Sequence, residues 1–126
     1  MLSRILFPLV LCILLPNVGH ADPNVDIGPV LSDWAQTDDA CNTDNKFRIF
    51  KDVDFYTLQG PKLVCVLLDV TKTETVYTFV ASCGESEETK LKDFKDQTIR
   101  MDPDADFGVM DMEVGGVKYE LVDCQY

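Results

Sequence analysis

Histidine is nearly absent from this chain: His20 is the only one among 126 residues. It lies in a segment typical of a secretory signal peptide, residues 1–21. Arg4 precedes an apolar run from Ile5 to Leu15, and Gly19 and Ala21 are the small residues before the expected cleavage site. A mature chain without imidazole lacks the usual general base, the usual proton shuttle and the commonest zinc ligand. We therefore expect no enzyme activity, no metal and no cofactor.

Long hydrophobic runs are also missing. The run from Ile5 to Leu15 is too short to span a bilayer comfortably, and no second one follows it. We therefore expect a secreted, extracellular protein that is not anchored in a membrane.

Basic residues are few compared with acidic ones. Removal of residues 1–21 takes away Arg4 and no acid, which leaves 10 basic against 22 acidic residues and a net charge of −12. This charge excludes nucleic acid as a partner. It is compatible with high solubility, with basic protein partners and with small cationic ligands.

Cysteine occurs four times after residue 21, and no two form a C-x-x-C unit. The absence of that unit argues against a zinc ribbon and a thioredoxin-type redox site. An even number in an oxidising compartment predicts two disulfides, and all three pairings remain open. The four residues are Cys41, Cys65, Cys83 and Cys124.

Two regions follow the leader. Residues 22–45 are polar and predict an N-terminal arm, in which Val30, Leu31 and Trp34 have the spacing of one helical turn. Residues 46–126 predict a β domain, because apolar residues alternate there with polar ones. The pattern predicts six strands in an antiparallel meander, which we expect to form an all-β barrel that is closed or incomplete. The first predicted strand runs from Phe47 to the turn at Gln59-Gly60-Pro61-Lys62, and the others cover 63–70, 75–81, the end of 89–101, 107–114 and 117–125.

Acidic residues late in the chain suggest two kinds of site. Asp102, Asp104, Asp106 and Glu113 partly match a calcium-binding loop, but the glycine lies at position 7 instead of 6. We therefore expect a solvated acidic turn there.

The strand 107–114 leaves two orientations open. In one, Asp111 and Glu113 face a cavity beside Phe107 and could pair with a ligand amine, with Tyr119 as an aromatic wall. In the other, Met110 and its neighbours form the buried face and the acids face solvent. Phe55 and Tyr77 are further candidates for the cavity wall, although core packing is the default explanation for each of them.

An ordered set of features resembles the tick salivary lipocalins of the histamine-binding type. It comprises a signal peptide, the Asp33-Trp34 pair, a Gly-Pro turn, the Leu63-Val64-Cys65-Val66 strand and a Tyr-x-Leu-x-Asp-Cys strand from Tyr119 to Cys124. The resemblance implies an eight-stranded antiparallel barrel, with Trp34 packed at its closed end. In that family two further strands and a helix follow the Asp-Cys motif, whereas this sequence stops at Tyr126.

The resemblance implies a secreted, monomeric binding protein that sequesters a small host mediator, either a biogenic amine such as histamine or a lipid. The alternative is a secreted inhibitor that binds a host protein, such as a protease, a complement component or a chemokine, through its surface.

Overall fold

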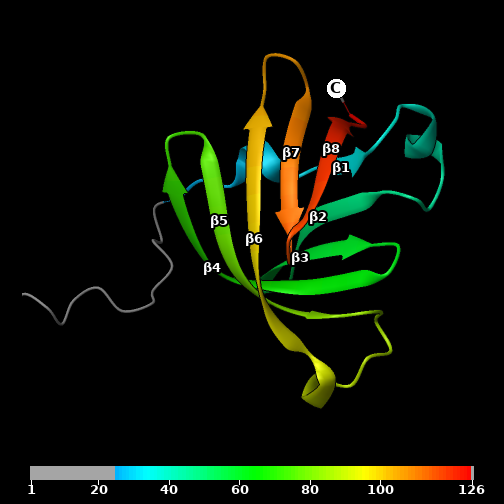
Figure 1. The fold of residues 1–126 in the computed structure, drawn as a ribbon, viewed down its shortest axis with the longest axis vertical. Coiled ribbons are helices and arrows are strands. Elements are labelled where there is room, and N and C mark those ends of the chain that lie inside the picture. Colours follow the sequence, from blue (N-terminus) through cyan, green and yellow to red (C-terminus); the bar gives the residue numbers. More distant parts are fainter. Residues whose placement is uncertain (1–24, 126) are drawn as a thin grey trace, which may run out of the picture.

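Eight antiparallel strands form a closed barrel in the computed structural model, which describes residues 25–125 (Figure 1). The expected all-β meander with a lipocalin-like barrel is thereby confirmed, and the barrel is complete. The predicted signal peptide lies outside the described residues. The strands are β1 (Asp33–Ala35), β2 (Phe47–Asp52), β3 (Phe55–Gly60), β4 (Leu63–Thr73), β5 (Val76–Gly84), β6 (Lys95–Asp104), β7 (Val109–Val114) and β8 (Val117–Asp123).

Alternation along each strand decides which side chains fill the barrel. In β5, Tyr77, Phe79 and Ala81 are buried, whereas Val80 between them is 47% exposed. The same pattern on the other strands produces an interior of aliphatic, aromatic and methionine side chains. No polar or charged residue is buried among the described residues. The interior is thus a packed apolar core, as expected of a small barrel.

The segment before β2 differs from the expected arm. It holds two short 3₁₀ turns, η2 (Gly28–Val30) and η3 (Asp39–Asn42), and between them the short strand β1, which the sequence pattern does not predict. β1 pairs with β2 on one side and with β8 on the other, so it closes the barrel. Trp34 in β1 is buried, as expected, and its Nε1–H donates a 2.9 Å hydrogen bond to the Val30 carbonyl.

The prediction of one strand from Phe47 to the turn at 59–62 is wrong. A turn at Val53, which has a left-handed φ of 52°, divides this segment into the β2–β3 hairpin. The alternation of apolar residues continues across the turn, so periodicity alone does not reveal that the chain reverses there. β6 also runs to Asp104 through Pro103, beyond the turn expected at that proline.

Two disulfides are present, which is typical of an oxidising compartment. Cys65 and Cys83 lie opposite each other on β4 and β5, and their side chains point into the barrel. Cys41 in η3 joins Cys124 just after β8, 83 residues away. The prediction that all four cysteines are paired is confirmed.

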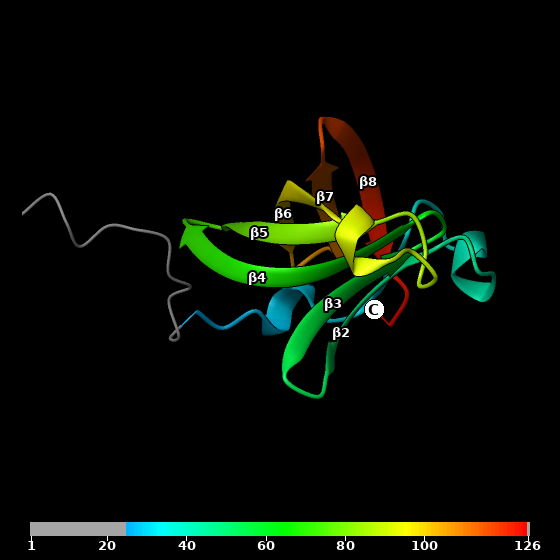
Figure 2. The ribbon, with the colours of Figure 1, turned by 90° about the horizontal axis from the view of Figure 1, so that it is seen from below.

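The two ends of the barrel differ. One end, here called the mouth, carries the β1–β2 loop, the β3–β4 turn, the β5–β6 loop and the β7–β8 turn. The other end carries the remaining hairpin turns and is covered by residues 25–31, here called the strap. Val25 and Leu31 of the strap pack against the barrel core, and η2 contacts β6. In the view of Figure 2 the strap is the blue segment drawn below β4. Within residues 25–125, no helix is long and apolar enough to cross a membrane.

Candidate functional site

The orientation of β7 settles one of the alternatives left open by the sequence. Met110, Met112 and Val114 are buried in the barrel, so Asp111 and Glu113 lie on its outer face. Arg100 on β6 pairs with Glu113 at 3.8 Å. The orientation that would have placed both acids in a barrel cavity is therefore wrong, because the uniformly apolar methionine face supplies more hydrophobic burial than the mixed face.

The aromatic candidates are scattered. Tyr77 is 2% exposed and belongs to the core. Phe107 is 73% exposed in the β6–β7 turn. Tyr119 is half-buried near the mouth, and Phe55 is 57% exposed near the strap. The structure does not bring these four aromatic side chains together in one site. Among all the predicted candidates, Asp111, Glu113 and Tyr119 line one pocket of about 310 Å³, together with the cations Arg100 and Lys118.

A mainly apolar pocket of about 340 Å³ lies beneath the strap. We call it the strap pocket. The strap forms one wall, the β2–β3 turn another, and the middle of β4 a third. Its lining residues are Val25, Ile27, Asp54, Phe55, Tyr56, Leu67, Leu68, Asp69, Val70 and Phe79.

The strand lengths explain why this pocket forms. β3 begins only at Phe55, and its first pair with β4 joins Tyr56 to Leu67. A β-bulge follows between Leu67 and Asp69, where β4 bends away from the regular ladder. Beyond this point β4 has no β3 partner, and Val25 and Ile27 of the strap cover the gap instead. Side chains of the barrel core, such as Phe79, therefore reach the pocket floor.

The charges in the strap pocket all have one sign. Asp54 and Asp69 are the only charged residues in its lining. Lys51 lies beside the pocket, with its Nζ 5.9 Å from the centre of the ring of Tyr56, one of the lining residues. An apolar pocket with aromatic walls and two carboxylates has the chemistry that binds a small organic cation.

Sequence reasoning missed both of these acids. Asp69 interrupts the apolar run of β4, and this interruption was the available signal. A carboxylate in a strand that is expected to be covered on both sides is costly to bury and therefore marks a polar site or an exposed position. Asp54 follows the hidden turn at Val53 and could be assigned to a site only once that turn was known. Phe55 is the one predicted ligand-binding residue that lies in the strap pocket.

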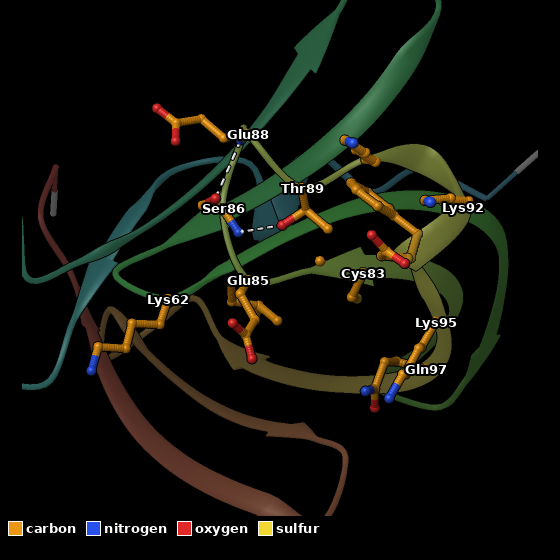
Figure 3. A pocket seen from close by; sticks show the side chains of 14 residues that line it. Lys62, Cys83, Glu85, Ser86, Glu88, Thr89, Lys92, Lys95 and Gln97 are labelled. Carbon is orange, nitrogen blue, oxygen red and sulfur yellow. Dashed lines mark hydrogen bonds between the residues drawn. The ribbon is translucent and has the colours of Figure 1, made fainter.

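A larger cavity, of about 880 Å³, lies at the mouth between the β3–β4 turn and the β5–β6 loop. We call it the loop groove. Lys62 lies on one side of it, and Lys92 and Lys95 lie on the other (Figure 3). Glu85 is also in the lining, so charges of both signs alternate on exposed side chains. Such a surface is well solvated and binds small ligands poorly compared with an apolar pocket.

Metal binding has no support from the described part of the chain. Between residues 25 and 125, no three His, Cys, Asp or Glu side chains come together in a group that could hold a metal ion.

Comparisons with known proteins add no identification: no protein-family model, curated protein or solved structure matches this chain.

Proposed function

We propose that this protein is a secreted binding protein that sequesters a small host mediator, a biogenic amine such as histamine, in the strap pocket. One observation carries the proposal. The strap pocket is apolar and partly aromatic, and carboxylates are its only charged lining groups. A cation bound there would meet Asp54 and Asp69 while its organic body contacts Phe55, Tyr56 and Phe79.

The two ligand classes implied by the resemblance differ in their demands. A lipid mediator needs a long apolar cavity for its chain, and the barrel interior is already filled by core side chains. A lipid carboxylate would also be repelled by Asp54 and Asp69 in the strap pocket. The strap pocket, with a volume of about 340 Å³, has a size that suits a small amine. The structure therefore favours the amine over the lipid.

The setting supports the same function. The two disulfides fit an extracellular location, and the resemblance to tick salivary lipocalins suggests the saliva of a blood-feeding arthropod. Binding by mass action needs no catalytic group, in agreement with the lack of histidine after residue 21.

The second function, inhibition of a host protein through the surface, retains one observation in its favour. Asp102, Asp111 and Glu120 lie directly opposite one another on β6, β7 and β8 and form an outward-facing row of carboxylates. This row could contact a basic protein surface. No described strand is an edge strand, because each has a partner on both sides for at least part of its length, so the carboxylate row is the surface that supports this function.

Calorimetric titration with matched ligands tests the proposal. Histamine and phenethylamine should bind, and phenylacetamide, which has a similar ring but no charge, should bind at least about tenfold more weakly, as expected when a charge-assisted hydrogen bond is lost. Equal affinities for the amine and the amide would overturn the proposal. Capture of a serum protein without any binding of amines would favour the second function instead.

A further inference from the structure

We infer that the mouth of the barrel holds a second site, which binds a small aromatic or branched apolar carboxylate. The site is a pocket of about 270 Å³, separate from the strap pocket and here called the mouth pocket. Its lining comprises Gln36, Asn45, Phe47, Pro61, Lys62, Leu63 and Tyr119.

The floor of the mouth pocket is built from aromatic and aliphatic side chains. Phe47 is 7% exposed and packs edge-to-face against Tyr119, with 4.9 Å between the ring centres. A glycine opposite Phe47 makes this position available: a Cβ on Gly60 would lie 2.6 Å from the Phe47 ring. The absence of a side chain at Gly60 therefore allows Phe47 to lie against β3. The two rings, together with Leu63, offer a wall for the apolar body of a ligand.

The charge of the mouth pocket is the reverse of the charge in the strap pocket. The sequence has 22 acidic residues, yet none lines the mouth pocket, whose single charged residue is Lys62. Within the described part of the chain, Lys62 makes no ion pair, and Figure 3 shows its side chain extending away from Lys92 and Lys95. The nearby cations Lys46 and Arg48 are held by Asp33, at 3.6 and 3.5 Å. Lys62 is thus the cation available to a ligand.

Two amides complete the site. Gln36 follows β1 and Asn45 precedes β2, so both lie beside the mouth. Their NH₂ groups can donate hydrogen bonds to a carboxylate that pairs with the Lys62 ammonium. An ammonium, two amide donors and aromatic walls are complementary to a monocarboxylate with a compact apolar body. The same groups offer no anion to an amine.

A series of three ligands that differ only in the charged group tests this inference: 3-phenylpropanoate, 3-phenylpropanamide and 3-phenylpropylamine. In calorimetric titrations of the full mature chain, 3-phenylpropanoate should bind at least about tenfold more tightly than the amide. The variant Lys62→Met, which keeps the apolar stem of the side chain, should remove that preference. Lys95→Met, which changes a lysine outside the mouth pocket, is the matched control and should retain it.

Near-ultraviolet circular dichroism of each variant checks that the barrel is intact. The inference is overturned if 3-phenylpropanoate binds no better than the amide, or if Lys62→Met and Lys95→Met have the same affinity for it. Strap-pocket variants provide a second check. Asp54→Asn should leave binding of 3-phenylpropanoate unchanged, and a loss of that binding would place the carboxylate in the strap pocket and contradict the inference.

Discussion

Ser32 Oγ donates a 2.5 Å hydrogen bond to Asp123 Oδ1, which joins residues 91 positions apart. This bond lies at the seam where the first strand meets the last. The seam is short, because β1 pairs with β8 through only two residue pairs. The Cys124 N–H also donates to the Asp33 carbonyl at 2.8 Å, and the Cys41–Cys124 disulfide lies next to these bonds. The disulfide and these two hydrogen bonds thus strengthen the closure of the barrel between β1 and β8, where few strand pairs contribute.

The seam disulfide should stabilise the fold more than the inner one. Loop-closure entropy predicts a loss in unfolding free energy of about 4.5 kcal/mol for the double variant Cys41→Ala/Cys124→Ala and about 3 kcal/mol for Cys65→Ala/Cys83→Ala. The difference arises because the sequence separations are 83 and 18 residues. Urea unfolding of both variants measures it. A smaller loss for the Cys41/Cys124 variant would mean that the seam does not depend on its disulfide.

Trp34 reports on the packing of the strap. Because Trp34 is 2% exposed and bonds to Val30, its fluorescence maximum should lie well to the blue of free tryptophan in water. Trp34→Phe should lower the unfolding free energy by about 2 kcal/mol, through lost volume and a lost hydrogen bond. Emission like that of free tryptophan would contradict the burial.

The carboxylate row on the outer face should cost stability. Asp111 lies directly between Asp102 and Glu120, and like charges in directly opposite cross-strand positions repel. Asp111→Asn should therefore raise the free energy of unfolding by about 0.5 kcal/mol, which is measured as a slightly higher melting temperature. This gain in stability should shrink as salt is added. Thr98→Ser, on the outer face of β6 outside the row, serves as a control whose response to salt should match the wild type. A gain that is independent of salt would rule out repulsion as its cause.

Much of the barrel could be predicted from local patterns. The alternation in 75–81 and 117–125 and the glycine pair at Gly115-Gly116 located β5, β8 and the last hairpin to within a few residues. These signals are local, because a strand with one buried face shows its period in its own sequence.

The strand β1 and the β2–β3 turn could not be predicted in this way. β1 is three residues long and becomes a strand only through its pairs with β2 and β8, which are distant in sequence. The turn at Val53 carries no glycine, proline or asparagine at the position of positive φ, although such residues usually mark a tight turn. Because the β2–β3 turn forms one wall of the strap pocket, Asp54, which follows that turn, escaped prediction as well.

Binding of histamine to two double variants distinguishes an amine site beneath the strap from one on the outer face of the barrel. Asp54→Asn/Asp69→Asn removes both carboxylates of the strap pocket, whereas Asp111→Asn/Glu113→Gln removes two carboxylates from the outer face and keeps the change in net charge the same. In calorimetric titrations at one ionic strength, we expect the first variant to bind histamine at least about tenfold more weakly than the wild type and the second to bind it with unchanged affinity. Equal losses in both variants, or a loss confined to the Asp111/Glu113 variant, would contradict an amine site beneath the strap.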